Sequence, residues 1–559
     1  MDTKRLVLFI VFSMSILMLW DVWQRQHAPA PVAQQGEQKS STSNSSSPSL
    51  NAPAVLDSDF KLAQGQRVNV VTDLYNVDID TTGGDLRKLV LLKHRANNSD
   101  KANFILLDDA AKPMVYVAQT GLVGADLPNH KAIFTSALTS YKMPANKDTL
   151  EVRLSWAGKS GISVDKVYTF HRNQYLIDVN YEIKNGSNVA IIPTVYYQIV
   201  HDKESNQGSK LQPTFTGGTY FTQVTQFKKL AFKDMNKEPL DVKTNDGWVG
   251  ILQHYFVSVW IQKSGISREF YTEKLNNDIY RIGSKSTLAS IAPGASAIVP
   301  AQFYSGPQNK QQLEAAAPGL DLTVDYGVLK ILAAPLFWVL SKINSLVNNW
   351  GVAIILLTLM IKAAFYPLSA KSYRSMAQMR ELAPRLESMK QKFGDDRKKM
   401  QQAMMELYKS EKINPMSGCL PILIQIPVFI SLYWMLLGSV ELRHAPFFGW
   451  ITDLSAPDTL FGTIPSSIPL IGGTPIGLLP IIMGLSMIIQ TRLNPKPADP
   501  VQAKVMTWMP VIFSIFFFFF PAGLVLYWVV NNVISIWQQW FINKSIHAEA
   551  LLKKKVVKN

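Results

Sequence analysis

Hydrophobic residues follow two different patterns along the chain. From about residue 56 to residue 322, apolar and polar residues alternate over short stretches that end at Gly or Asn turns. Beyond residue 350, apolar residues form long continuous runs instead. Alternation is typical of half-buried β-strands, whereas runs of about twenty apolar residues are typical of membrane helices. The pattern predicts an all-β domain followed by a polytopic α-helical membrane domain.

The alternating part predicts many short strands. The clearest stretches are 68–82, 166–186, 253–265 and 286–306. Many short strands with few helical stretches predict a large β-sandwich over 56–322. Two roles stay open for it: a folded spacer or docking domain, or a carbohydrate-processing enzyme. Deleting 60–320 would abolish function only if the chemistry resided there, and no convergent carboxylates or histidines favour an enzyme.

The N-terminal segment carries an apolar run from Leu6 to Trp20 behind Lys4 and Arg5. Such a run belongs to a cleaved signal peptide or to an uncleaved anchor. The nearest small-residue cleavage site, at 28–30, lies well past the run, which favours an uncleaved transmembrane anchor over 1–23. Seven of the ten residues from Ser40 to Ser49 are serine, so 24–55 is expected to be a disordered linker.

A strongly apolar stretch over 323–349 is interrupted by Lys330, Pro335 and Lys342. These residues suit an amphipathic helix that lies in the membrane interface better than they suit a span. Five further apolar runs follow within a membrane core over 350–545, and with the anchor they make six spans. The five runs lie at about 350–368, 418–437, 475–490, 505–520 and 523–541.

Basic residues give the orientation of these spans. The segments that share a side with the N-terminus hold 21 Lys and Arg residues, whereas the short segments on the opposite side hold only Arg443. Cytoplasmic loops are enriched in Lys and Arg. Both termini are therefore expected in the cytoplasm, with 546–559 as a basic tail, and the β domain on the other side of the membrane. The formal net charge of +15 then reflects topology and lipid headgroups, with no specific nucleic acid as partner.

Lys362 lies twelve residues after Trp350, inside the first core span. A charged residue near mid-span costs about 2.5–3.5 kcal/mol on insertion scales, so it usually has a partner or a function. No Asp or Glu lies within any predicted span from 350 onward. Lys362 either snorkels to the cytoplasmic interface or faces a water-filled cavity that an anion can enter, and the second hypothesis is favoured.

Other polar residues of the predicted spans are candidates for the same cavity. Thr358 lies one helical turn before Lys362, and Gln425 lies in a span loosened by two prolines. Asn531 and Asn532 lie midway along the last span. Polar clusters of this kind often join helices instead, and for the asparagine pair the two interpretations stay open.

The segment 369–416 carries 11 basic and 6 acidic residues between two spans. Its apolar spacing predicts two antiparallel cytoplasmic helices, the first kinked at Pro384. Four methionines lie on the apolar positions: Met376, Met379, Met400 and Met404. They form either the seam of a solvated hairpin or an adaptable surface for apolar segments or a ribosome-side partner.

Motifs for covalent chemistry are missing from the sequence. Cys419 is the only cysteine, so an intramolecular disulfide is impossible. The eight histidines show no metal-ligand spacing, and nucleotide-binding or hydrolase motifs do not occur. We therefore expect neither a cofactor nor a metal, and no enzymatic activity.

Several segments resemble the YidC-type membrane protein insertases of the YidC/Oxa/Alb family, in the Gram-negative form. The matching motifs are YPLSAKSYRSMAQMRELAP (366–384), GDDRKKM (394–400), INPMSGCLPILIQIPVFISLYWML (413–436), GSVELRHAPF (438–447), KVMTWMPVIF (504–513) and PAGLVLYWVVNN (521–532). The resemblance implies five core helices around a hydrophilic groove and a β-supersandwich periplasmic domain. It further implies an inner-membrane insertase and chaperone that receives nascent membrane proteins from the ribosome or the Sec translocon.

Two features depart from the family pattern. Lys362 matches a groove position where the family commonly has arginine, which keeps the charge but loses the planar fork. The outer loop 448–474 is longer than expected. In the hypothesis that follows, a polar or acidic substrate tail is attracted by Lys362. Its apolar helix then slides into lipid along a face made by Phe429, Tyr527 and Trp528.

A solute transporter or channel with Lys362 as its anion site is the competing hypothesis. It predicts an internal repeat with a matching interrupted span. The sequence has no such repeat. An insertase therefore remains the favoured function.

Overall fold

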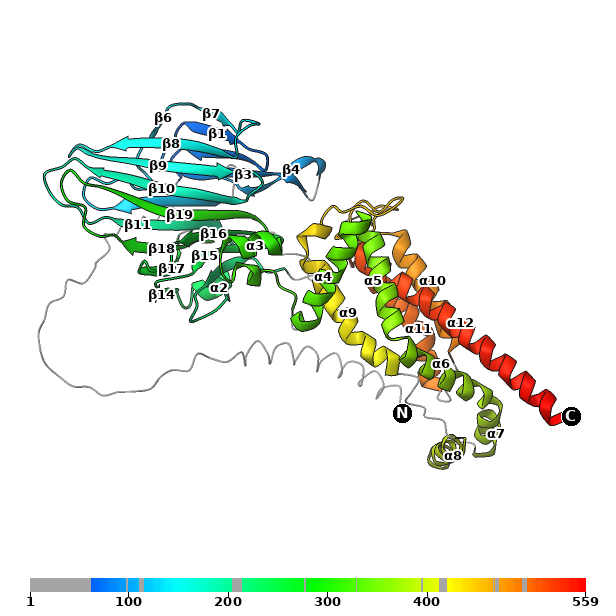
Figure 1. Cartoon of the computed structure of the whole chain (residues 1–559). Coiled ribbons are helices and arrows are strands. Elements are labelled where there is room, and N and C mark those ends of the chain that lie inside the picture. The colour runs from blue at the N-terminus through cyan, green and yellow to red at the C-terminus, as the bar shows by residue number, and fades with distance from the viewer. Residues whose placement is uncertain are drawn as a thin grey trace, which may run out of the picture.

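The computed structural model describes residues 62–96, 99–109, 115–203, 214–275, 278–327, 329–393, 396–411, 420–465, 467, 472–494 and 500–558. The predicted anchor (1–23) and linker (24–55) lie outside these residues. The described chain forms two parts, an all-β domain and a helical bundle that meets it at one end (Figure 1). The change of hydrophobic pattern near residue 322 therefore marks a real domain boundary.

The β domain consists of two stacked sheets, and all but one of the strand pairs are antiparallel. The first sheet has the order β14 (Asp241–Thr244), β17 (Arg268–Lys274), β18 (Ile279–Thr287), β11 (Thr194–Asp202), β5 (Tyr116–Val123), β3 (Asp85–Ala96), β2 (Tyr75–Asp80), β1 (Arg67–Val71) and β7 (Ser140–Lys142), with β4 (Ser99–Leu107) also paired to β3. The second has the order β13 (Lys228–Leu230), β12 (Gly217–Phe221), β15 (Trp248–Gln253), β16 (Phe256–Gln262), β19 (Ser296–Pro307), β10 (Leu176–Asn185), β9 (Ile162–His171), β8 (Thr149–Ala157) and β6 (Thr135–Ser136).

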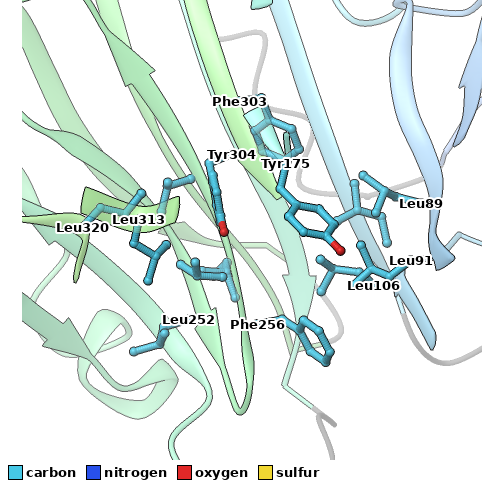
Figure 2. Packing of buried hydrophobic residues seen from close by; sticks show 14 of the residues in the cluster. Leu89, Leu91, Leu106, Tyr175, Leu252, Phe256, Phe303, Tyr304, Leu313 and Leu320 are labelled. Atoms are coloured by element: carbon cyan, nitrogen blue, oxygen red, sulfur yellow. The ribbon is translucent and has the colours of Figure 1, made fainter. Parts of the chain in front are cut away.

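The apolar residues of the alternating pattern form the core between the two sheets. In β10, Ile177, Val179 and Tyr181 are fully buried, while the residues between them are partly exposed. The turn from β9 to β10 runs through Asn173, whose φ of 57° suits an asparagine. Figure 2 shows part of this buried cluster, in which Tyr175 lies between Tyr304 and Leu89 and Phe256 lies at the lower end of the group. The predicted all-β domain is confirmed.

The helical part follows two short helices, α2 (Phe232–Met235) and α3 (Lys310–Ala316), and the 3-10 helix η2 (Leu320–Thr323). Its helices are α4 (Lys330–Val347), α5 (Trp350–Ala364), α6 (Tyr366–Glu381), α7 (Ala383–Phe393), α8 (Arg397–Ser410), α9 (Leu420–Gly438), α10 (Leu478–Leu493), α11 (Pro500–Phe517) and α12 (Ala522–Lys558), with the 3-10 helix η4 (Val440–Leu442) after α9. In Figure 1, α7, α8 and the C-terminus lie at the end of the bundle away from the β domain.

The predicted spans coincide with helices, but their ends differ. Of the residues described, α4 alone is long and apolar enough to cross a bilayer by itself, and the bent pair α5–α6 is a second candidate. The apolar helices at the second, third and fourth of the five predicted runs are shorter. Helix α12 continues through the predicted tail to Lys558, so most of 546–559 extends the last helix.

Two helix ends follow from local chemistry. Helix α4 stops at Asn348, which adopts a left-handed φ of 50°, and the side chain of Asn349 accepts a hydrogen bond from Val352 N to begin α5. Helix α5 ends at Ala364, four residues before the predicted end of its span, and α6 leaves at an angle of 67°. Pro367 lies in the first turn of α6, where its missing N–H is tolerated.

The predicted hairpin of two helices is instead three helices. The chain breaks at Leu382, directly before Ala383 and Pro384, so the expected kink is a boundary between α6 and α7. Inside a continuous helix Pro384 would lack an N–H donor and clash with the carbonyl four residues earlier, whereas in the first turn of α7 it is tolerated, which explains the break. Helix α7 packs against α8, while α6 packs against α12.

One carboxylate, besides backbone hydrogen bonds, ties the described part of the loop 448–474 to the bundle. Asp458 is 6% exposed, and its oxygens accept hydrogen bonds from Leu479 N (2.8 Å), Trp450 Nε1 (3.1 Å) and Leu460 N (3.1 Å). Leu479 lies in the first turn of α10, whose N-cap residue Gly477 has no side chain to cap the helix. Asp458 thus supplies that cap from the loop, and it ties the loop to the bundle.

Replacing Asp458 by alanine is therefore expected to destabilise the bundle by about 1–3 kcal/mol, since a buried acceptor of three donors is lost. Thermal unfolding of the purified protein in detergent measures the effect. Asp148→Ala is the control, because the Asp148 side chain is 96% exposed. Equal melting temperatures for the two variants would contradict the role given to Asp458.

Candidate functional site

Lys362 occupies the last turn of α5 and is buried in the bundle. Its side chain is on the bundle side of the helix, and the residue is 7% exposed. Thr358, one turn earlier, is 1% exposed and donates its hydroxyl to Ile354 O over 2.7 Å. The Thr358 hydroxyl is therefore used within its own helix, which leaves Lys362 as the polar group that α5 presents.

The ammonium of Lys362 is held by the last helix. Lys362 Nζ donates to Ser535 Oγ over 2.7 Å, and Ser535 Oγ lies 2.7 Å from Asn531 O on α12. The serine donates its only hydroxyl hydrogen to that carbonyl, so its lone pairs remain to accept from Lys362. Ser535 is 2% exposed. One donor of the ammonium thus has a fixed acceptor from a residue 173 positions away.

Both asparagines form hydrogen bonds to other helices, and neither lines the cleft described below. Asn531 accepts a hydrogen bond from Gln425 Nε2 of α9. Asn532 donates to Ser486 Oγ of α10 over 3.0 Å and is 3% exposed. Asn532 therefore joins α12 to α10, as polar residues between membrane helices often do. Asn531 links Ser535 to Gln425, because its backbone carbonyl accepts from the serine and its side chain accepts from the glutamine.

A cleft lies beside this chain of hydrogen bonds, where α5 bends into α6 and faces α9. It is a shallow, open cleft, and its empty volume of about 350 Å³ includes space that belongs to the outside. Its lining residues are Ile361, Lys362, Phe365, Leu368, Ser369, Ile424, Gln425 and Val428. Three of the eight are polar, and they lie among apolar walls, which suits a site for a chain with both polar and apolar parts.

The cleft is positively charged. The sequences of α5, α9, α10 and α11 contain no Asp or Glu. Within the described part of the chain, no carboxylate lies within the 4.0 Å ion-pair distance of Lys362 Nζ. The charge therefore has a neutral hydrogen-bond partner and remains available to an anion.

The predicted apolar face is built in part. The rings of Phe429 and Trp528 meet edge to face at 4.5 Å, and Phe517 lies 5.4 Å from Trp528. Tyr527, in contrast, is 2% exposed, because successive helical residues point about 100° apart. Phe429 and Trp528 thus lie together with Phe517, while Tyr527 belongs to the packed interior.

The four methionines lie on two separate helices of the segment 369–416. Met376 and Met379 are on α6, which packs against α12, while Met400 and Met404 are on α8, which packs against α7. All four are partly exposed. A single continuous methionine seam is therefore not formed between the two pairs.

Ser369 is a cleft residue that sequence reasoning missed. It is 6% exposed and lies seven residues after Lys362, two turns further on an uninterrupted helix. Its position is not obvious from the sequence, because the bend between α5 and α6 separates the two residues. The seven-residue spacing, which places two residues on the same face of a helix, could have indicated that Ser369 lies near Lys362.

Comparison with known families assigns both parts of the chain. Residues 67–339 match the family described as the YidC periplasmic domain, and residues 342–549 match the 60Kd inner membrane protein family. Together these matches cover the β domain, α4 and the helices that line the cleft.

Relatives that match along the full length of the chain agree with these two family matches. The chain is 56% identical over 563 residues to a membrane protein insertase YidC of Methylobacillus flagellatus, with 99% of both chains covered. It is 47% identical over 560 residues to a membrane protein insertase YidC of Aromatoleum aromaticum, with 98% of this chain and 99% of that one covered.

Two solved structures are among the similar ones. A crystal structure of an active YidC insertase with its first transmembrane domain resolved has 20% identity, a TM-score of 0.38 and coverage of 85% of this chain and 92% of that one. A galactose mutarotase related enzyme from Lactobacillus acidophilus has 10% identity, a TM-score of 0.31 and coverage of 43% and 97%. From the family matches and the full-length relatives, the chain belongs to the YidC family of membrane protein insertases, inner membrane proteins with a periplasmic domain.

Proposed function

We propose that this chain inserts integral membrane proteins and helps them fold, by non-covalent transfer through the cleft between α5 and α9. The observation that carries the proposal is Lys362, a buried cation in a half-polar cleft with a hydroxyl for its partner. The relatives' full-length similarity supports the same function.

The proposed topology has six spans with both termini in the cytoplasm. The distribution of 21 basic residues against Arg443 alone supports this orientation. The position of α7, α8 and the C-terminus away from the periplasmic domain is consistent with it (Figure 1). Helix α4 is proposed to lie in the outer interface, since Lys330 and Lys342 interrupt it and Trp338 is 63% exposed.

The short core helices support a role for local membrane thinning. Helix α5 has 15 residues and α10 has 16, which correspond to about 22 and 24 Å. A typical hydrocarbon core is about 30 Å thick. A bilayer that thins to match these helices presents a lower barrier to a polar segment.

In the proposed mechanism, the polar tail of a substrate enters the cleft first. An acidic group is drawn to Lys362, whose ammonium keeps donors that Ser535 does not use. Gln425 and Ser369 add hydrogen-bonding groups at the cleft surface. These contacts replace part of the water that the tail loses.

The apolar helix of the substrate then moves into lipid past Phe429 and Trp528. Burial of about twenty apolar residues supplies the free energy, so the cleft has only to lower the barrier for the tail. No covalent step is needed. The proposed partners are nascent membrane proteins, delivered by the ribosome or shared with the Sec translocon, with the partly exposed methionines of α6 and α8 as an adaptable cytoplasmic surface.

Lys362→Ala and Lys362→Glu test the electrostatic step. Insertion of a Sec-independent substrate with a short acidic tail is expected to fall about tenfold or more, with glutamate worse than alanine, since attraction becomes repulsion. Lys362→Arg should retain activity. The measurement is insertion into proteoliposomes, scored by protection of the tail from protease.

Lys342→Ala is the matched control, a lysine of α4 outside the cleft. Site-specific photocrosslinking from positions 362, 425 and 528 to a stalled nascent chain tests the path independently. Wild-type insertion by both Lys362→Ala and Lys362→Glu would contradict the electrostatic step, while absent crosslinks from all three positions would contradict the cleft.

Ser535→Ala tests whether the serine holds the ammonium in place. A hydrogen bond of about 1 kcal/mol is lost, so we expect about fivefold slower insertion of the acidic-tail substrate, measured in the same assay. Ser535→Thr keeps the hydroxyl and should insert normally. Ser545→Ala, at an exposed position of the same helix, is the control. Equal rates for Ser535→Ala and Ser545→Ala would argue against the assigned role.

A further inference from the structure

Arg443 is the one basic residue in the short segments on the periplasmic side of the predicted topology. The proposed insertion mechanism does not use it. It follows η4 at the β-domain end of the bundle and is 9% exposed, although arginine side chains are rarely buried this deeply. Its environment therefore requires a specific explanation.

Asp453 attracts the guanidinium, and two aromatic rings of the periplasmic domain also contact it. The guanidinium carbon of Arg443 is 5.1 Å from the ring centre of Phe104 in β4 and 5.5 Å from that of Phe256 in β16. The two rings stack with centres 4.4 Å apart and an angle of 21°. A buried guanidinium over aromatic faces is a favourable cation–π arrangement, stronger when water is excluded.

This contact joins the two parts of the protein through a firmly held ring. Phe256 is 1% exposed and belongs to the buried cluster, at the lower end of the residues drawn in Figure 2. The ring of His94 in β3 meets it edge to face at 5.4 Å. Movement of the bundle relative to the β domain must therefore break the arginine contact, because the ring cannot follow.

Hydrogen bonds connect the same two surfaces nearby. Asn309 Nδ2 donates to Glu441 Oε1 over 2.9 Å, and His254 Nε2 donates to Leu437 O over 2.8 Å. Gly438 also approaches the segment before α4 closely, since a Cβ there would lie 3.0 Å from Asp325 O. The arginine is thus the charged centre of a wider interface.

We propose that Arg443 is a positioning residue that seats the periplasmic domain on the outer end of the membrane bundle. We call Arg443, Phe104 and Phe256 the Arg443 clasp. The clasp fixes the connection after α9 against the domain while it leaves the substrate cleft, at Lys362, untouched. The inference goes beyond the proposed function and does not depend on it.

Titratable groups around the clasp make its stability depend on pH. Burial, Arg443 and His444 lower the pKa of His94 to about 4. Burial, opposed by the bond to Leu437 O, lowers the pKa of His254 to about 4, with Arg443 contributing. His444 itself faces Asp453 at 3.3 Å. Burial raises the pKa of Glu441, which opposes the two histidines as pH falls.

The direction of the pH effect on the junction follows from the linkage between proton binding and opening. An unpaired histidine has a pKa of about 6.5, so an opened junction binds protons at a higher pH than the closed one does. The closed junction is fully favoured above about pH 6.5 and is weakened as pH falls towards 4. Protonated histidines would also lie beside the arginine charge, which repels them.

The test is a distance measurement on the full-length protein in nanodiscs. Spin labels are placed at Val224 of the β domain and Phe461 of the periplasmic loop, both exposed, in a Cys419→Ser background. Pulsed electron resonance then gives the distribution of distances. Arg443→Met, which keeps the apolar stem, is expected to raise the open fraction about tenfold at pH 7.5. Arg443→Lys should restore part of the closed population.

Two controls separate the clasp from general loss of structure. Arg153→Met removes a 40% exposed arginine of β8 and should leave the distribution unchanged. Protease resistance of the β domain shows that it remains folded in the Arg443→Met variant. A folded Arg443→Met protein with the wild-type distribution would overturn the proposal. Insertion activity is not the readout, so the outcome is independent of the proposed function.

The second part of the experiment repeats the distance measurement at lower pH. Between pH 6.5 and 4 the wild-type distribution should broaden, and the double variant His94→Gln with His254→Gln should respond much less. Phe104→Leu should act like Arg443→Met and add little to it, because both remove the same contact. Additive effects of those two substitutions, or a wild-type distribution that is independent of pH, would count against the clasp.

Discussion

The hydrogen bond from Lys362 to Ser535 is the interaction around which the helical part is arranged. A cation in a bundle without acidic residues in α5, α9, α10 or α11 needs neutral acceptors, and α12 supplies them. The serine in turn donates to Asn531 O, and Asn531 accepts from Gln425. Three helices are thereby held around one charge. The cleft exists on the side that this arrangement leaves open.

The neutral partner has a functional consequence. A carboxylate beside Lys362 would form a closed ion pair, and a substrate's acidic group would then compete with it. A hydroxyl satisfies the buried donor without cancelling its charge. The bend between α5 and α6 adds to this, because it brings Ser369 to the same cleft and ends α5 at Ala364. The charge is thus stabilised enough to persist and remains able to attract an anion.

The cleft residues that are chemically exceptional could be predicted from the sequence, whereas those defined by geometry could not. Lys362 and Gln425 stand out because polar residues are rare in apolar runs, and both line the cleft. Which face a residue occupies was harder to predict. Tyr527 and Trp528 are adjacent, yet one is packed inside and the other joins an aromatic cluster. Likewise, the pairing of Lys362 with Ser535 spans 173 positions and depends on how helices pack. The β domain was predictable from its alternation, whereas the cap that Asp458 gives α10 comes from a distant loop.

Lys362 and Arg443 became conspicuous for the same reason, since both violate the usual placement of basic residues in a membrane protein. The two basic side chains have different types of contact partner in the structure. Lys362 donates a hydrogen bond to a hydroxyl at the edge of the cleft, and its ammonium has further donors for an anionic group. The guanidinium of Arg443 lies over two stacked rings, and its planar shape suits that contact better than an ammonium would. The two cations thus differ in their surroundings: Lys362 keeps donors for the proposed substrate, whereas the guanidinium of Arg443 lies over aromatic rings at the junction between the two parts.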